Sequence, residues 1–217
     1  MKLSETPAVR WGGHAARYKE FPRAVVRAYD PYSLSPLTFQ LDLEMTAWHH
    51  VRFRADVKSL TCRPTRVQAK IDGKELEAQT TFSAVLRDGR RQYHLVCRDE
   101  ASGPNWRALT QIARHNGAVI EVHDRATLAA DAKRNDRLVR LVQASVIHLR
   151  DGPAADPLIV AAVRDGCSRR SDLIAQLKQF TSQLIDGRAA QLHCAGVLQM
   201  DLAEDDFGVS IRGGRHD

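Results

Sequence analysis

The sequence predicts an α/β body followed by a small C-terminal domain of the winged-helix type. Residues 37–150 alternate segments of helical and strand periodicity in the order helix, three strands, helix, strand, helix. Residues 157–212 then show three short helical patterns and a possible pair of strands, which is the layout of a winged helix. The turn-forming sequence Asp151-Gly152-Pro153 separates the two parts. We therefore expect a basic N-terminal arm at residues 1–36, an α/β domain at 37–150 and a winged-helix-like domain at 151–217.

The first expected element is a helix that begins near Leu37. Leu37, Leu41, Met45 and Trp48 follow helical spacing on one stripe, and Glu44 falls on the same stripe. A carboxylate on the apolar side of a helix is costly unless it is paired, hydrogen-bonded or facing a site. Glu44 is therefore expected either to reach solvent at the edge of the stripe or to belong to a site.

Three strands are expected after this helix. Val67 to Ile71 alternate apolar and polar residues, and Asp72-Gly73 is a turn signal. The segments Glu77 to Arg87 and Arg90 to Arg98 flank Asp88-Gly89 and are predicted to form a β-hairpin.

Helices and strands then alternate up to the C-terminus. A helix is expected to begin near Pro104 and to end before Gly117, because proline favours the first turn and glycine the position after the last. The run Ala118 to Val122 predicts a strand, and the segment from Arg125 to His148 predicts a long helix rich in arginine. The C-terminal segments are Pro157 to Arg164, Ser171 to Phe180 and Ile185 to Ala195 as helices, and Val197 to Leu202 and Gly208 to Arg212 as strands.

Composition excludes several classes of protein. The chain has 217 residues, which is enough for one medium domain or two small ones, each with its own core. No apolar run approaches the roughly 20 residues that a membrane span needs, and residues 1–10 lack the apolar region of a secretory signal. The four cysteines do not suggest a disulfide scaffold. We expect a soluble, cytoplasmic protein with no membrane partner.

The charge is divided unevenly along the chain. Residues 1–150 contain 25 Lys and Arg against 16 Asp and Glu, whereas residues 151–217 contain 7 against 10. This division indicates that a polyanion partner such as DNA would bind the first part, although a basic composition can also serve solubility alone.

Familiar motifs for phosphate loops, metalloproteases and serine hydrolases are absent. The pairs His49-His50 and His193-Cys194 are adjacent in sequence, so their side chains point in different directions and neither pair is a ready chelate. From these residues we expect no metal site and no cofactor.

The order of the predicted elements resembles the TnsA endonuclease family, the subunit of heteromeric transposases that nicks the 5′ ends of the element. The resemblance is carried by Phe39-Gln40-Leu41-Asp42-Leu43-Glu44, Thr80-Thr81-Phe82, Asp88-Gly89 and Leu95-Val96-Cys97. It covers the chain from about Leu37 to Arg212 and rests on order and spacing. It implies a restriction-endonuclease-like (PD-(D/E)xK-type) mixed sheet with flanking helices, plus a C-terminal winged-helix domain.

The resemblance also implies a catalytic site, and this sequence departs from it at most positions. In the family a helix Glu and two strand acids hold Mg²⁺, and a Lys acts on the attacking water. Here Glu44 matches the helix Glu, Thr81 and Leu95 match the two strand acids, and Cys97 matches the Lys. Only Glu44 is retained, and Mg²⁺ requires oxygen ligands that leucine and cysteine do not provide.

The sequence therefore predicts a catalytically inactive pseudo-nuclease that binds DNA through Arg134, Arg137 and Arg140. The resemblance implies two protein partners, a DDE transposase subunit and an ATP-dependent transposition regulator. One alternative is an active Mg²⁺-dependent endonuclease with a rearranged site. A second alternative is a winged-helix DNA-binding regulator that needs residues 157–212. The candidate ligands for the rearranged site are Asp99, Glu75, Glu77 and Asp88.

Overall fold

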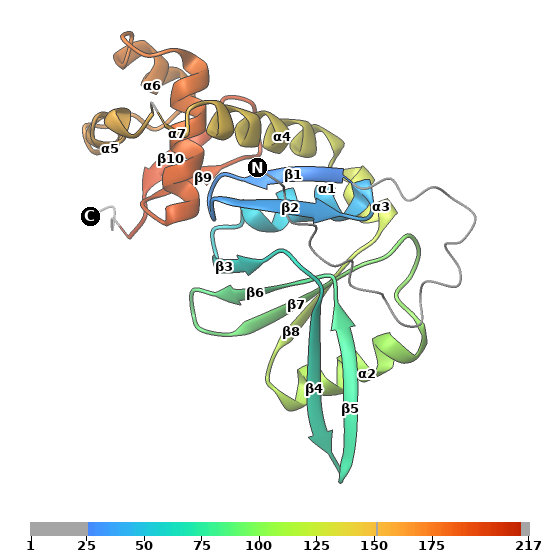
Figure 1. Ribbon diagram of the computed structural model, residues 1–217. Helices are drawn as coiled ribbons and strands as arrows, with labels where there is room; N and C mark the ends of the chain where they lie inside the picture. Colours follow the sequence, from blue (N-terminus) through green and yellow to red (C-terminus); the bar gives the residue numbers. More distant parts are fainter. Residues whose placement is uncertain (1–25, 151, 214–217) are drawn as a thin grey trace, which may run out of the picture.

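The computed structural model describes residues 26–150 and 152–213. The described chain is an α/β structure with a mixed sheet and flanking helices, as the sequence predicts (Figure 1). The part of the predicted arm at residues 1–25 lies outside the described residues.

An N-terminal hairpin occupies the start of the predicted first helix. β1 (Val26–Asp30) and β2 (Ser35–Phe39) pair antiparallel. This hairpin contains the last residues of the predicted arm, 26–36, and the first residues of the predicted helix, 37–39. Leu37 and Phe39 are buried while Pro36 and Thr38 are exposed, which is the alternation of a strand with one buried face. The prediction of a helix from Leu37 was wrong because these residues fit helical spacing and strand alternation at once.

The turn between β1 and β2 is fixed by a buried carboxylate. Asp30 accepts hydrogen bonds from the backbone N–H of Tyr32 at 3.0 Å and from the hydroxyl of Ser33 at 2.6 Å. The carboxylate also forms an ion pair with Arg52 at the end of the next helix. The hairpin is thereby attached to the helix that follows it.

Helix α1 (Asp42–Arg52) lies between two apolar clusters. Its residues Ala47 and Val51 pack with Phe82 of the main sheet, whereas Trp48 packs in a second cluster that includes Leu138. Both faces of α1 are therefore covered, one by the sheet and one by another helix.

The main sheet has the strand order β3-β6-β7-β8. Its strands are β3 (Val57–Thr61), β6 (Phe82–Leu86), β7 (Arg91–Val96) and β8 (Val119–His123). The first three are antiparallel neighbours, and β8 is parallel to β7 because α2 (Gly103–His115) crosses over between them. The apolar side of α2 packs on the face of the sheet opposite α1.

A second hairpin extends from this body. β4 (Thr65–Ile71) and β5 (Lys74–Thr80) pair around Asp72 and Gly73, which both have positive φ, so the predicted turn is confirmed (Figure 1). The single strand that we predicted from Glu77 to Arg87 is divided at Thr81. Its first half pairs with β4 and its second half with β3.

The predicted arginine-rich helix is divided in the same way. α3 (Arg125–Ala130) is capped by Asp124, whose carboxylate accepts from the backbone N–H of Thr127 at 2.7 Å. α4 (Ala132–Ile147) begins directly afterwards, with Asp131 between the two helices.

The C-terminal part has the predicted three helices and two strands. They are α5 (Asp156–Arg164) after a short 3₁₀ turn η2 (Pro153–Ala155), α6 (Arg170–Gln176), α7 (Ser182–Ala195), β9 (Leu198–Asp201) and β10 (Gly208–Ile211). The two strands pair antiparallel.

The C-terminal part packs closely against the α/β part. A Cβ atom at Gly187 of α7 would lie 2.6 Å from the backbone of Ala144 in α4, so only glycine permits this helix contact. His193 of α7 accepts a hydrogen bond from the backbone N–H of Met200 at its Nδ1 (3.0 Å). Its Nε2–H donates to the carbonyl of Phe53 (3.1 Å). One apolar cluster therefore continues across the predicted boundary at residues 151–153.

Candidate functional site

Glu44, the one retained residue of the matching set, lies in the first turn of α1. Its Oε2 accepts the backbone N–H of Gln40 at 2.8 Å. Burial raises the pKa of this carboxyl, and hydrogen bonds from the backbone of Gln40 and Leu41 act in the opposite direction. The carboxylate is thus hydrogen-bonded to the start of its own helix.

Leu95, which matches the second strand acid, is not directed toward α1. Its side chain packs with Tyr93, Leu109 and Ile112 on the face of the sheet that α2 covers. Thr81, which matches the first strand acid, accepts the backbone N–H of Val96 at its hydroxyl oxygen (2.9 Å). Both positions therefore serve the packing and hydrogen bonding of the sheet.

Cys97, at the position of the family's Lys, directly follows β7. Its backbone N–H donates to the carbonyl of His123 at 3.0 Å. Burial raises the pKa of the thiol, and the nearby carboxylates of Asp124 and Asp99 raise it further. The higher pKa keeps the thiol protonated near neutral pH, and the protonated form is a poor nucleophile.

The candidate ligands for a rearranged site do not gather around Glu44. Glu77 forms an ion pair with Arg66 at 3.0 Å on the extended hairpin, and Asp88 pairs with Arg90 at 2.7 Å. Among residues 26–150 and 152–213, one group of three or more His, Cys, Asp and Glu residues has ligand atoms close enough to hold a metal ion, and it contains none of these acids.

The three arginines of α4 differ in their surroundings. Arg137 is 9% exposed and donates to the carbonyl of Leu202 and to Asp205, so it joins α4 to the β9–β10 hairpin. Arg140 is exposed and also pairs with Asp205 at 2.7 Å, and Arg134 pairs with Asp131 at 3.7 Å. The guanidinium of Arg137 is thus engaged within the chain and little exposed, and its predicted contact with DNA stays a prediction.

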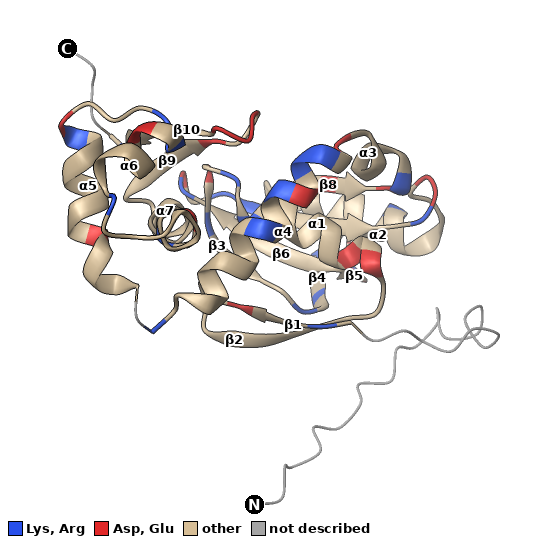
Figure 2. Ribbon diagram, turned by 90° about the horizontal axis from the view of Figure 1, so that it is seen from above, with Lys and Arg blue, Asp and Glu red and all other residues tan. Residues whose placement is uncertain are grey.

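A cleft of about 650 Å³ lies between the start of α4, the loop after α1 and the end of β9. Cationic and anionic side chains both line it, and Figure 2 shows basic residues along α4 and at α3. The charged residues of the lining are Arg54, Asp56, Asp131, Lys133, Arg134, Arg137 and Asp201.

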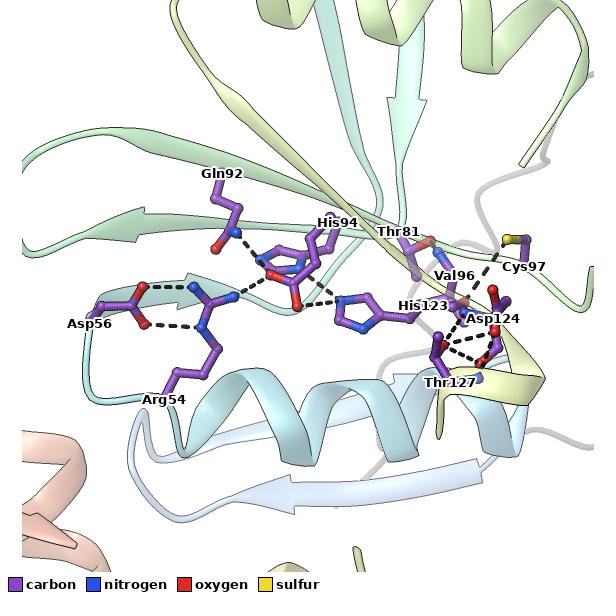
Figure 3. A network of polar contacts seen from close by, with 11 residues as sticks. Arg54, Asp56, Thr81, Gln92, His94, Val96, Cys97, His123, Asp124 and Thr127 are labelled. Atoms are coloured by element: carbon purple, nitrogen blue, oxygen red, sulfur yellow. Dashed lines mark hydrogen bonds and ion pairs between the residues drawn. The ribbon is translucent and has the colours of Figure 1, made fainter. Parts of the chain in front are cut away.

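The one close metal-ligand group among the described residues consists of His94, Glu121 and His123, which come from the parallel neighbours β7 and β8. A hydrogen bond of 3.0 Å joins Nδ1 of His94 to Nε2 of His123, and the two ring planes are 18° from parallel with their centroids 5.3 Å apart (Figure 3). Nε2 of His123 lies 3.9 Å from Oε1 of Glu121. His94 and His123 are buried, whereas the side chain of Glu121 is 34% exposed.

A polar network orients the carboxylate of Glu121. Its Oε2 accepts from the guanidinium of Arg54 and from the side-chain amide of Gln92, the latter at 2.8 Å. Arg54 is itself held by Asp56 through two hydrogen bonds of 3.0 and 2.7 Å (Figure 3). The other carboxylate oxygen of Glu121, Oε1, therefore faces His123.

Both imidazoles of this group are neutral. Burial lowers the pKa of His94 to about 3, with His123 and Arg54 as further causes. Burial also lowers the pKa of His123, although the carboxylate of Glu121 acts against this shift. Neutral imidazoles keep a nitrogen lone pair, which is the form that binds metal ions.

The sequence analysis missed this group, and the available signal was weak. Gln92 and His94 are two residues apart on one strand, and Glu121 and His123 are two apart on another. Such spacing places each pair on one face of its strand. Only the parallel register of β7 and β8, which sets His94 opposite Glu121, brings the two pairs together.

No protein-family model matches the sequence, and a comparison with curated proteins gives no match. The relation to the TnsA endonuclease family is therefore a proposal. Within the part of the chain that the structure describes, no helix combines the length and the apolar character needed to cross a membrane.

Proposed function

We propose that the protein is a TnsA-like subunit of a DNA transposition system, which binds DNA and partner transposition proteins without cutting DNA. The connectivity of the body supports this proposal. The order α1, β3, β6, β7, α2, β8, with antiparallel strands followed by one parallel strand, is the order that a restriction-endonuclease-like (PD-(D/E)xK-type) core requires. The β4–β5 hairpin is then an insertion between the first and second core strands.

The proposal that the subunit does not cut DNA rests on the residues at the positions that match the family's catalytic site. The hydroxyl oxygen of Thr81 accepts a backbone N–H, Leu95 lies in an apolar cluster, and the thiol of Cys97 stays protonated. Mg²⁺ is a hard ion that needs several oxygen ligands, and its role is to activate water and neutralise charge on the phosphate. Glu44 alone cannot supply that coordination.

The proposed DNA surface lies on the exposed side of α4. Lys133 and Arg140 are seven residues apart and share one stripe of the helix, and both are exposed. The ion pair of Arg140 with Asp205 lies at the surface, where such pairs are weak, so a DNA phosphate can compete for the guanidinium. Arg134 adds a third cation on the same helix.

The C-terminal part is proposed to be a winged-helix domain that binds a protein. α5, α6 and α7 followed by the β9–β10 hairpin give the element order of a winged helix. The acidic turn of this hairpin is paired with cations of the chain itself, since Asp205 binds Arg137 and Arg140. We propose the ATP-dependent regulator as the partner of this domain and the DDE transposase as the partner of the core.

Binding of the full chain to a short DNA duplex tests the proposed surface. Each lost phosphate contact weakens binding for all sequences alike and lowers the slope of log Kd against log salt by about 1. We expect the double variant K133A/R140A to lower this slope by about 2. The matched control is Lys178→Ala, which removes an exposed lysine from the C-terminal part. Equal slopes for the wild type and the double variant would contradict the proposed surface.

The same titration, repeated with duplexes of different sequence, distinguishes the proposed pseudo-nuclease from the alternative, a winged-helix regulator. Such a regulator reads base edges, so one duplex sequence would be bound far more tightly than others. A phosphate-binding pseudo-nuclease instead binds unrelated duplexes with similar affinity. A preference of roughly a hundredfold or more for one sequence would favour the regulator.

A further inference from the structure

Two imidazoles and one carboxylate converge on one face of the main sheet, beneath α1. The parallel pairing of β7 and β8 sets His94 opposite Glu121 and Val96 opposite His123, so the arrangement is built into the register of the sheet. The ligand atoms of His94, Glu121 and His123 all lie within 4.8 Å of one another. Backbone hydrogen bonds hold both strands, so the three side chains start from fixed positions.

The carboxylate is oriented as metal-binding carboxylates are. Arg54 and Gln92 occupy Oε2 of Glu121 and leave Oε1 on the side of His123. Asp56 in turn fixes Arg54 with two hydrogen bonds. Hydrogen bonds of this kind orient ligands and tune metal sites in proteins.

Two buried polar atoms at this place have no hydrogen-bond partner among the described residues. They are Nε2 of His94, whose residue is 0% exposed, and Oε1 of Gln92, whose residue is 4% exposed. A buried polar atom without a partner is costly, so each such atom in a folded protein requires an explanation, such as a bound ion or water molecule. A water molecule carried by a metal ion would donate to Oε1 of Gln92, whereas Nε2 of His94 would carry the ring proton once Nδ1 binds the ion.

We propose that His94, Glu121 and His123 bind one divalent transition-metal ion of the zinc class. Two nitrogens that each lie about 2.0–2.1 Å from one tetrahedral Zn²⁺ are roughly 3.3–3.4 Å apart, so the ion would replace the proton of the 3.0 Å His94–His123 hydrogen bond and move the two rings slightly apart. Imidazole ligands suit Zn²⁺, Co²⁺ and Ni²⁺, whereas Mg²⁺ prefers oxygen ligands. The partly exposed side chain of Glu121 marks the side from which the ion enters.

This site differs from the Mg²⁺ site that the family resemblance implies. None of its three residues is Glu44, Thr81, Leu95 or Cys97, so the proposal does not depend on the proposed function. Three protein ligands leave one tetrahedral position for water. Bound there, the ion would join β7 to β8.

Titration of the metal-free full chain with Co²⁺ and then Zn²⁺ tests the proposal. Tetrahedral Co²⁺ absorbs visible light, and Zn²⁺ displaces it. We expect one Co²⁺ per chain, displaced by one Zn²⁺ and unaffected by a large excess of Mg²⁺. Failure to bind stoichiometric Co²⁺ or Zn²⁺ would overturn the proposal. A sulfur-to-cobalt charge-transfer band would place the ion on a cysteine and would also overturn it.

Variants assign the ion to the three residues. Glu121→Gln keeps the size of a partly exposed side chain, so it is expected to fold, and it should weaken Zn²⁺ binding by about tenfold or more. His123→Gln should weaken it at least as much. His115→Gln removes an exposed histidine at the end of α2 and should leave the affinity unchanged.

The melting temperature gives a second readout that does not depend on the colour of Co²⁺. Zn²⁺ at about 100 times its Kd should stabilise the wild type, because it binds only the folded state. The same Zn²⁺ concentration should shift the melting temperature of Glu121→Gln much less. Equal affinities and equal shifts in Glu121→Gln and the wild type would show that these residues are not the ligands.

Discussion

Replacement of His193 by glutamine is expected to remove the contribution of one buried histidine to the pH dependence of stability between pH 7 and pH 4. In the folded chain Nδ1 of His193 accepts the N–H of Met200, and Nε2–H donates to the carbonyl of Phe53. This pattern requires the neutral imidazole. Protonation of Nδ1 would place two N–H groups against each other in a site that is 2% exposed.

The magnitude follows from the pKa of this group. Burial lowers the pKa of His193 from 6.5 to about 4, with the positive charges of Arg212 and Arg87 as weaker causes. The unfolded chain therefore takes up the proton first as the pH falls. Stability is fully present above pH 6.5 and is lost as the pH falls toward 4. One pKa unit corresponds to about 1.4 kcal/mol, so the loss amounts to about 3 kcal/mol at pH 4.

Urea unfolding at pH 7, 6, 5 and 4 measures this effect. The glutamine side chain cannot take up a proton, so His193→Gln should be less stable than the wild type at pH 7 and should approach it as the pH falls. Other buried histidines, such as His49 with a pKa of about 4, contribute to both proteins and cancel in the difference. A constant difference in unfolding free energy across this pH range would refute the reasoning.

Two further predictions concern the contacts between α4 and the C-terminal part. Gly187→Ala should lower the unfolding free energy by about 1–3 kcal/mol, because the new Cβ would lie 2.6 Å from the backbone of α4. Gly208→Ala is the control in thermal melts, because a Cβ at Gly208 would have no atom closer than 3.4 Å. Arg137→Met should cost about 1–3 kcal/mol, because it leaves the carbonyl of Leu202 without its donor, whereas Arg140→Ala should change stability by less than about 1 kcal/mol. Equal losses in both arginine variants, measured by urea unfolding, would contradict the distinction.

The elements that the sequence predicted correctly are those with a local signal. The extended hairpin follows from alternation around Asp72-Gly73, and α2 from a proline at its start. The first helix was placed too early, since Leu37 satisfies two periodicities and the packing of the β1–β2 hairpin decides between them. The break at Thr81 also depends on pairing, because the two halves of that stretch find different partner strands.

The candidate metal group and the role of Arg137 depend on contacts that are distant in sequence. His94 and His123 are 29 residues apart, and each shares its strand face with only one other polar residue, Gln92 and Glu121 respectively. In the sequence, Arg137 looks like the other arginines of α4. Its side chain is buried because it pairs with Asp205, which lies 68 residues later. Periodicity identifies a face of one element and does not identify what lies against it.

The central claim is that the protein binds DNA without cutting it. The most direct test incubates the full chain with supercoiled plasmid and Mg²⁺ or Mn²⁺, and follows DNA binding and strand nicking in the same samples. The proposed pseudo-nuclease retards the plasmid in a salt-sensitive manner and produces no nicked circles above the buffer control. Nicking that requires the metal ion and disappears in Glu44→Gln would contradict the claim and establish an active endonuclease.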